Sequence, residues 1–362
     1  TWETIATWNI GLDMSFLNSR LNFTGDYFIR DTEGMLAKSY VLPSVFGAKE
    51  PKENCADLRT KGWELSLNWN DSFALMGKRF NYTVSASLGD NKTVITKYNN
   101  PEKLLTDYYE GMVLGEIWGY RIDGLFASDE EATEYTSKIN QDFVNARILS
   151  DKVDPYYRAG DLKFRDLDNN NVINKGDDTV YDPGDREIIG NETPRYNYSF
   201  RLGADWNGFD LGIFFQGVGK RDWYPNHLST GFWGPYSRAF TSFIPENFMD
   251  QCWSEENPGG YFPRFRGYQT FKDSQLGVNN DRYLQNASYI RLKNLTVGYT
   301  LPVLKKVFTK LRVYFTGENL WYWSPMKKYT KYIDPEAAGG NGNTGMAYNY
   351  SRNFSVGVDI TF

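Results

Sequence analysis

The sequence predicts an all-β fold, an antiparallel β-barrel whose strands cross a membrane. Three observations support this prediction. Apolar and polar residues alternate along nine segments, most of these segments run for about ten to thirteen residues, and the connections between them alternate between short and long. Because successive side chains of a strand point to opposite faces of a sheet, this alternation gives each strand one apolar and one polar face. The length suits tilted strands that cross a bilayer.

The alternation is clearest at the end of the chain and around its best turn. In "NFSVGVDITF", apolar residues occupy every second position from Phe354 to Phe362. The alternating segments "RYNYSFRLGADW" and "FDLGIFFQG" flank Asn207 and Gly208, the residue pair best suited to a two-residue type I′ turn. The sequence therefore predicts a hairpin at 194–219 and a closing strand that ends on an aromatic residue.

We expect nine strands, at residues 2–14, 20–32, 60–71, 79–91, 194–206, 209–219, 286–301, 310–321 and 352–362. Short connections lie at 15–19, 72–78, 207–208 and 302–309, and long ones at 33–59, 92–193, 220–285 and 322–351. Outer-membrane barrels have short periplasmic turns and long outer loops, so we expect the long connections to face outward. Since lipid does not tolerate unpaired sheet edges, we expect further strands before Thr1 or from another chain.

The composition limits the classes of function. Aromatic residues make up 17% of the 362 residues, and the mean hydropathy is -0.57. No apolar run reaches the roughly 18 residues of a helical membrane span. The net charge of -5 gives no reason to expect nucleic acid as a partner, and the single His227 excludes histidine triads. Cys55 and Cys252 are too few for a disulfide framework, and we expect both to be unpaired.

Six blocks of sequence carry a family resemblance. In chain order they are "NIGLDMSFLNSRLNFTGDYFIRDTEGML", "RTKGWELSLNW", "GDLKFRDLDNNNVINKGDD", "PRYNYSFRLGADWNGFDLGIFFQG", "ASYIRLKNLTVGYTLP" and "RVYFTGENLWYWS". Together they resemble the C-terminal barrel region of SusC/RagA-type TonB-dependent outer-membrane transporters of Bacteroidetes. The resemblance spans essentially the whole chain.

The resemblance implies an organisation and a function. Residues 1–362 would form the C-terminal portion of one 22-stranded barrel in the bacterial outer membrane, with extracellular loops at 92–193, 220–285 and 322–351. The remaining N-terminal strands, the plug and the TonB-binding segment are absent from this sequence. The family imports large nutrients with the help of TonB and a SusD-like surface lipoprotein that closes the barrel mouth. The sequence does not distinguish glycan from peptide cargo.

The segment "DLDNNNVINKGD" has the ligand spacing of an EF-hand-type calcium loop. Its positions 1, 3, 5, 7, 9 and 12 are Asp166, Asp168, Asn170, the Val172 carbonyl, Asn174 and Asp177. Asn171 replaces the usual glycine, which is tolerable because asparagine adopts the left-handed conformation. Asp177 replaces the usual glutamate. We expect a structural calcium ion that stiffens the long loop, with magnesium less suited; the alternative is a solvated acidic turn.

Aromatic residues of the outer loops are the candidates for binding substrate, because flat rings stack on the apolar faces of sugars. They are Trp223, Tyr224, Trp233, Tyr236, Trp253, Tyr261, Trp321, Tyr322 and Trp323. The same rings could instead form loop cores, or a membrane-interface girdle at the ends of strands. In the loop at 92–193, Ser128 and Glu131 form a capping-box pattern that predicts a short helix.

We expect a transport protein and no enzyme. Glu255-Glu256 and Asp177-Asp178 are adjacent carboxylates, which lack the facing geometry of a glycosidase pair. The polar strand faces fit the wet lumen of a barrel. The alternative is a secreted, calcium-stabilised β-sandwich that binds carbohydrate. In the barrel, Phe362 would be the terminal aromatic residue that the outer-membrane assembly machinery recognises.

Overall fold

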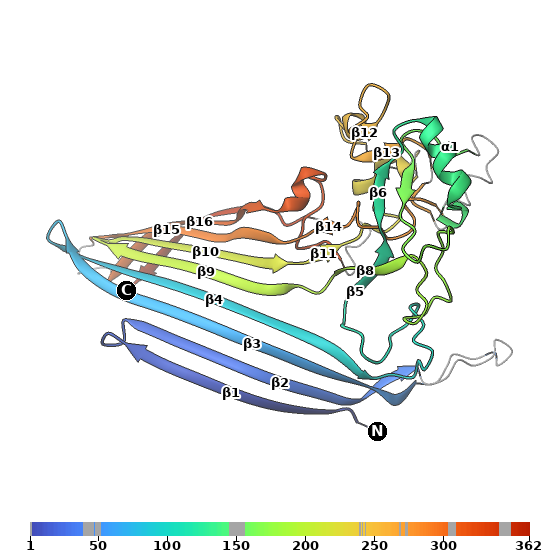
Figure 1. The fold of residues 1–362 in the computed structure, drawn as a ribbon. Helices are drawn as coiled ribbons and strands as arrows, with labels where there is room; N and C mark the ends of the chain where they lie inside the picture. The colour runs from blue at the N-terminus through green and yellow to red at the C-terminus, as the bar shows by residue number, and fades with distance from the viewer. Residues whose placement is uncertain are drawn as a thin grey trace.

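The computed structural model describes residues 2–38, 47, 52–144, 156–238, 240, 242, 244–267, 269–271, 274–302, 309–339 and 349–362. Within these residues the main element is one antiparallel sheet of nine strands (Figure 1). Its strand order is β1-β2-β3-β4-β9-β10-β15-β16-β17, so each long strand pairs with the next long strand of the chain. The other strands of this part of the chain are short.

All nine expected strands are confirmed. They are β1 (Thr4–Phe16), β2 (Leu21–Lys38), β3 (Lys52–Leu75), β4 (Lys78–Lys97), β9 (Arg195–Trp206), β10 (Phe209–Lys220), β15 (Tyr289–Leu301), β16 (Lys310–Trp323) and β17 (Asn353–Thr361). Because these strands share one continuous sheet, the two-sheet sandwich that the sequence left open is wrong.

The hairpin of β9 and β10 has the expected turn. Asn207 and Gly208 have φ values of 48° and 90°, the positive φ that both positions of a type I′ turn require. Trp206 and Phe209 lie opposite each other on either side of the turn, so the register begins at the first possible pair. Local turn chemistry therefore sets the register of this hairpin.

The first long connection is shorter than the expected 33–59, because β2 continues to Lys38 and β3 starts at Lys52. The register shifts on both sides of the pair Met35 and Ala56. Such bulges interrupt the alternation by which we identified strands. Cys55 consequently lies on β3, and it forms no disulfide with Cys252. Residues 39–46 and 48–51 of this connection, and 303–308 of the expected turn at 302–309, lie outside the described residues.

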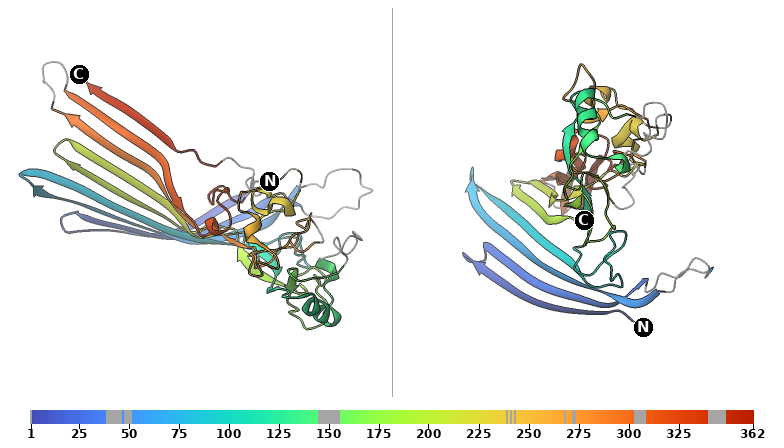
Figure 2. Two further views of the ribbon diagram at one scale, coloured as in Figure 1. Left: turned by 90° about the horizontal axis from the view of Figure 1, so that it is seen from above. Right: turned by 45° about the vertical axis from the view of Figure 1, so that its right-hand side comes forward.

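The sheet is curved like a trough, and the long connections gather at one of its ends (Figure 2). The short turns lie at the other end, where the chain also finishes (Figure 1). We call residues 98–194, 221–288 and 324–352 the outer-loop assembly. This arrangement confirms that short and long connections occupy opposite ends of the strands.

The outer-loop assembly contains short elements from three connections. From here on, the first connection joins β4 to β9, the second joins β10 to β15, and the third joins β16 to β17. The first connection holds β5 (Glu116–Tyr120), β6 (Ile122–Leu125), α1 (Asp129–Lys138), η2 (Asp142–Val144), β7 (Leu162–Phe164) and β8 (Arg186–Asn191). The second holds β11 (Asp222–Trp223), α3 (Thr230–Trp233), η3 (Gly234–Tyr236), η4 (Met249–Gln251), β12 (Cys252–Trp253), β13 (Phe262–Arg264) and β14 (Gln285–Asn286). The third holds η5 (Pro325–Lys328).

The main hydrophobic core of the described residues lies in the outer-loop assembly. Phe164 of the first connection, Trp233 and Phe262 of the second, and Met326 of the third are all buried in one cluster. The three connections therefore pack around a common core. Among the described residues, no helix is both long and apolar enough to span a membrane.

The helix α1 begins at the expected Ser128 and Glu131 pair, although the Glu131 carboxylate binds the N–H one residue before the N-cap. The Ser128 hydroxyl accepts a hydrogen bond from the Glu131 backbone N–H at 3.2 Å. The Glu131 carboxylate in turn accepts one from the Ala127 N–H at 2.7 Å. These bonds satisfy N–H groups that have no partner within the helix, which is why the helix starts here.

Candidate functional site

One face of the nine-stranded sheet is apolar and exposed. Ile10, Leu67, Val297 and Val358 lie on this face in four different strands, and their exposed fractions are 59%, 44%, 44% and 55%. A monomeric soluble protein rarely exposes a contiguous apolar surface of this extent. Lipid tails would solvate it, as they do the outer band of a membrane barrel.

An aromatic row crosses the same face near the short turns. The strand register places its members side by side on β3, β4, β9, β10 and β15: Phe73, Phe80, Trp206, Phe209 and Tyr299. The rings of Phe73 and Phe80 are 5.1 Å apart, and those of Phe209 and Tyr299 are 4.5 Å apart. Aromatic girdles of this kind mark the membrane interface in outer-membrane barrels.

A second aromatic group lies nearer the outer loops, where Tyr27 is opposite Trp63 and packs 6.2 Å from the Trp8 ring. Ten residue steps separate Trp63 from Phe73 on β3. They correspond to roughly 33 Å along the strand, or roughly 25 Å along the membrane normal at a tilt near 40°. This spacing matches the apolar band of a membrane barrel.

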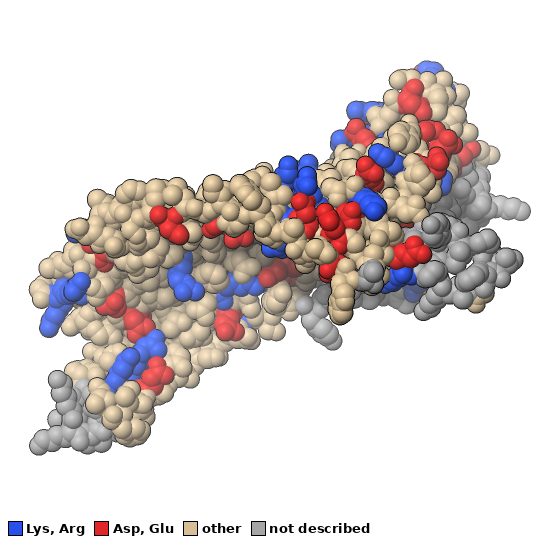
Figure 3. All heavy atoms as spheres, turned by 90° about the horizontal axis from the view of Figure 1, so that it is seen from below, with Lys and Arg blue, Asp and Glu red and all other residues tan. Residues whose placement is uncertain are grey.

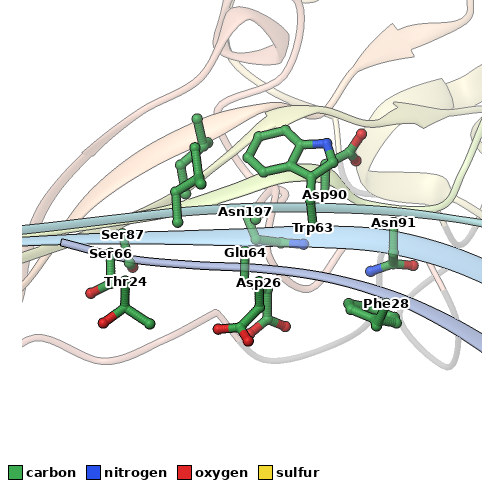
Figure 4. Close-up of a pocket in the computed structure, with 13 residues that line it drawn as sticks. Thr24, Asp26, Phe28, Trp63, Glu64, Ser66, Ser87, Asp90, Asn91 and Asn197 are labelled. Carbon is green, nitrogen blue, oxygen red and sulfur yellow. The ribbon is translucent and has the colours of Figure 1, made fainter. Parts of the chain in front are cut away.

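The opposite face of the sheet is polar. Figure 4 shows Thr24, Asp26 and Glu64 on one side of the strands, and Trp63 and Asp90 on the other. The residues drawn there line a hollow of about 440 Å³, in which Asp26 and Glu64 are direct cross-strand neighbours. Charged side chains gather along the hollow of the sheet and over the outer loops (Figure 3). This face is suited to contact with water.

An ion-pair network joins three strands on the polar face. The Arg312 guanidinium of β16 binds Asp210 of β10 at 2.6 Å and Asp359 of β17 at 3.0 Å. It reaches β10 across Gly298 of β15, where a Cβ atom would lie 2.5 Å from the Asp210 carboxylate. The glycine therefore leaves room for the pair to cross the intervening strand.

The expected calcium loop forms a carboxylate cluster, with one unexpected member. Oxygens of Asp166, Asp168 and Asp185 lie within 4.8 Å of one another. Asp185 is fully buried and accepts hydrogen bonds from the backbone N–H groups of Leu167 and Asn174, both at 2.8 Å. Several oxygens from one short segment are what a hard divalent cation needs.

Asp177, the expected closing ligand, is not one of the three clustered carboxylates, and its role as a ligand stays a prediction. Its backbone N–H donates to Asp182, whereas Asp185 supplies the third carboxylate. Asp185 lies outside the twelve-residue pattern, so the spacing could not identify it. Asn171 has the left-handed conformation that we expected at the usual glycine position, with φ 65°.

The other expected oxygen ligands are engaged within the loop. The Asn170 side chain accepts from the Val172 N–H at 2.7 Å, and the Val172 carbonyl accepts from the Asn174 side chain at 2.9 Å. Burial raises the pKa of Asp185 above its ordinary value of 3.8, and the nearby Asp168 and Asp166 carboxylates raise it further. The two backbone hydrogen bonds that Asp185 accepts oppose this rise.

Most of the candidate substrate aromatics are part of the loop core. Trp233 and Tyr236 are fully buried, and Trp223 is 2% exposed. These three rings take the loop-core role that the sequence left open as the alternative, and their contact with substrate stays a prediction. Tyr261 is half-buried against Tyr329, with ring centroids 3.5 Å apart.

The remaining aromatic residues differ in their hydrogen bonds and in their exposure. The Tyr224 hydroxyl donates to the Val278 carbonyl at 2.8 Å, and Trp253 is half-buried on β12. Trp321 and Trp323 are 49% and 55% exposed at the end of β16, and Tyr322 between them is half-buried. For these residues substrate contact remains a prediction.

A buried ion-pair cluster that the sequence did not indicate joins the sheet to the outer-loop assembly. Arg291 of β15 is 1% exposed and pairs with Asp334, which is 2% exposed, and with Glu336 at 3.1 Å. The Arg291 guanidinium also lies 4.7 Å from the Tyr322 ring. Removing one partner of such a pair would leave a buried charge without its counter-ion, which is strongly destabilising. The cluster therefore holds the third connection in a fixed position against β15.

Phe362 lies directly after β17, at the end of the sheet that carries the short turns (Figure 1). Its side chain is 84% exposed, and its carbonyl accepts a hydrogen bond from the Thr309 hydroxyl at 3.1 Å. The terminal aromatic ring is thus presented beside the edge strand.

Comparison with known proteins finds relatives along the whole chain, although no family model matches. TonB-dependent receptors P3 and P26 of Formosa agariphila are 28% and 27% identical, and the TonB-dependent receptor SusC of Bacteroides thetaiotaomicron is 23% identical, each over 100% of the chain. The chain spans 34%, 35% and 32% of the length of these proteins.

Solved structures show the same fold. The RagAB peptide transporter matches with a TM-score of 0.69 at 22% identity, over 100% of this chain and 36% of its own. The "open-open" state of the RagAB peptide importer matches with a TM-score of 0.67. The nine-stranded sheet therefore has the same fold as a part of that structure.

Proposed function

We propose, from the premise that this chain belongs to the SusC/RagA-type TonB-dependent receptors, that it supplies barrel wall and outer loops to an outer-membrane importer of large nutrients. The observation that carries the proposal is the exposed apolar face bordered by aromatic residues, with a polar face behind it. Its relatives are receptors and transporters, not enzymes.

The strand edges indicate what else the barrel requires. β1 and β17 are the terminal strands of the described sheet, and each pairs on one side only. Backbone groups at such edges must be satisfied within a membrane. We propose that the N-terminal strands of the same barrel close the gap, that a plug fills the polar interior, and that TonB supplies energy through a segment outside this chain.

The relatives also support a partner and a class of cargo. SusC and the RagAB peptide transporter are among its relatives, which supports a SusD-like surface lipoprotein as the partner of this chain. The cargo would be a glycan or a peptide. The outer-loop assembly, with its own core, gives such a partner a folded surface on which to close.

The carboxylate cluster of Asp166, Asp168 and Asp185 would hold a structural calcium ion, and magnesium is less suited. Calcium takes six to eight oxygens in flexible geometry, whereas magnesium demands a near-ideal octahedron. The ion would neutralise the buried Asp185 carboxylate and stiffen the first connection. Its role would be structural.

The test of the import function is made on the full-length natural protein in its native bacterium. We expect the protein to fractionate with outer membranes, to require detergent for extraction, and to support growth on its cargo; deletion of its gene should abolish that growth, and complementation should restore it. A protein that stays in aqueous solution without detergent, and whose deletion leaves uptake of every tested polymer intact, would contradict the proposal.

A further inference from the structure

A pocket in the outer-loop assembly is lined by three lysines. It forms where the connections after β10 and β16 meet, and its volume is about 260 Å³. Lys327, Lys328 and Lys331 belong to η5 and the residues that follow, and Glu246 is the single carboxylate among the described residues that line the pocket. This excess of positive charge favours an anionic ligand.

The ammonium groups are held in place but keep donors for a ligand. Lys327 Nζ lies 3.4 Å from the centroid of the Tyr322 ring and donates to the Tyr322 carbonyl at 2.7 Å. Lys328 Nζ lies 4.8 Å from the centroid of the Tyr329 ring. Within the described part of the chain, no ion pair joins these lysines to a carboxylate. Each ammonium has three donors, so at most two remain on Lys327.

The other walls of the pocket add an acceptor and apolar surface. Gln251 lines the pocket, and its Oε1 atom receives no hydrogen bond from the described residues. The Tyr332 side chain is 46% exposed, and the buried Phe232 and Phe248 also line the pocket. A fitting ligand therefore combines an anion, a hydrogen-bond donor and an apolar face. The volume is below the roughly 300–1,000 Å³ of drug-sized sites, so one compact unit fills it.

We propose that this pocket binds a carboxylate-bearing saccharide unit, so that the imported cargo is an acidic oligosaccharide. The inference rests on the proposed import function and specifies its cargo. The lysines neutralise the carboxylate, Gln251 accepts from a sugar hydroxyl, and the Tyr332 ring stacks on the C–H face of the sugar. An acidic peptide carries its carboxylate on a flexible chain without such a ring, so it matches fewer of these features.

The test measures binding to the full-length natural protein in detergent by isothermal titration calorimetry, with hexagalacturonate as the probe. We expect Lys328→Gln and Lys331→Gln each to weaken binding roughly tenfold, the effect of losing one charge-assisted hydrogen bond. Added salt should weaken binding because it screens charge. Lys138→Gln is the matched control: it removes an exposed lysine of α1 outside the pocket and should leave the affinity unchanged.

Two further probes, maltohexaose and hexaglutamate, and two further variants make the result decisive. Neutral maltohexaose should bind at least roughly tenfold more weakly than hexagalacturonate, since it lacks the charge. Lys328→Arg keeps the charge and should keep most of the affinity, which separates charge from packing. Equal binding of maltohexaose, or unchanged affinity in the double variant K328Q/K331Q, would overturn the role of the lysines.

Tighter binding of hexaglutamate than of hexagalacturonate would assign the pocket to acidic peptides and overturn the saccharide assignment. Because binding is measured without transport, the two proposals can fail separately. A membrane-embedded importer that ignores hexagalacturonate would overturn this inference alone, whereas a water-soluble protein without uptake would overturn the proposed function.

Discussion

The sheet and the outer-loop assembly of this protein place their apolar residues in opposite ways. In the sheet, large apolar side chains such as Ile10 and Val358 are more than half exposed. In the outer-loop assembly, Trp233, Phe262 and Tyr283 are fully buried and pack against one another. The loops thus fold as a soluble domain does, around their own core, whereas the sheet turns its apolar side outward.

This difference shows that the surrounding medium decides where an apolar side chain is stable. Water surrounds the loops, so burial stabilises their rings by roughly 25 cal/mol per Å² of apolar area. Lipid surrounds the outer face of the sheet under the proposed function, so exposure there carries no such cost. The same residue type therefore packs in a closed core in the loops and contacts the surrounding lipid in the sheet.

The largest expected difference in stability comes from removing one aromatic ring from each region. Trp233→Ala should destabilise the outer-loop assembly by about 3–5 kcal/mol, because it leaves a cavity in a closed core. Trp8→Ala on the apolar face should lower the free energy of unfolding by less than about 1 kcal/mol, since lipid or detergent fills the space. Urea titration with limited proteolysis of the loops measures both. Equal costs would contradict the comparison.

A charge placed on each face of one strand tests the lipid contact directly. Leu67→Arg lies midway between the aromatic groups of β3, where an arginine facing lipid should cost about 2–4 kcal/mol. Asn68→Arg, its neighbour on the polar face, should cost less than about 1 kcal/mol. Unfolding from lipid vesicles gives the two values. If Asn68→Arg proved the more harmful, the assignment of the faces would be reversed.

Calcium should stabilise the outer-loop assembly through Asp185. At a calcium concentration a hundredfold above Kd, we expect the free energy of unfolding of the loops to increase by about 2.7 kcal/mol. The increase is measured as a rise in their melting temperature. Asp185→Asn should abolish the rise. Asp177→Asn, outside the cluster, should retain it, and loss of the calcium effect in that variant alone would restore the twelve-residue pattern.

The calcium effect should also depend on pH. The folded pKa of Asp185 is raised above 3.8, so without metal its contribution to stability is present below that pH and is lost as the pH rises through the raised value. Calcium binds the ionised carboxylates, so its stabilisation should grow over the same interval. Melting curves at pH 4 and pH 7, with calcium or a chelator, measure this; a larger calcium effect at pH 4 would argue against the site.

The smallest effect on stability is expected at the end of the chain. Deleting Phe362 should lower the yield of assembled barrel with little change in the stability of the barrel that does form, because the Phe362 side chain is 84% exposed. Phe362→Tyr keeps an aromatic terminus and should restore the yield. Heat-modifiable migration on gels measures assembly, and normal assembly of the deleted chain would speak against an assembly role.

The amino-acid sequence by itself determined the sheet. The period-two alternation is local, and it locates all nine strands and both faces, while the Asn207-Gly208 pair sets one hairpin. The alternation gave wrong strand bounds around the bulges at Met35 and Ala56, and it ended one strand at 91 although β4 continues to Lys97. Local patterns suffice here because each strand repeats the same arrangement of apolar and polar sides.

The outer-loop assembly was decided by tertiary structure. Trp233 and Trp323 look alike in sequence, yet one is fully buried and the other is 55% exposed. Asp185 joins the carboxylate cluster from beyond the twelve-residue spacing, and the lysines of η5 meet Gln251 only because two connections pack together. These contacts join residues distant in the chain, and no local period records which of them will meet.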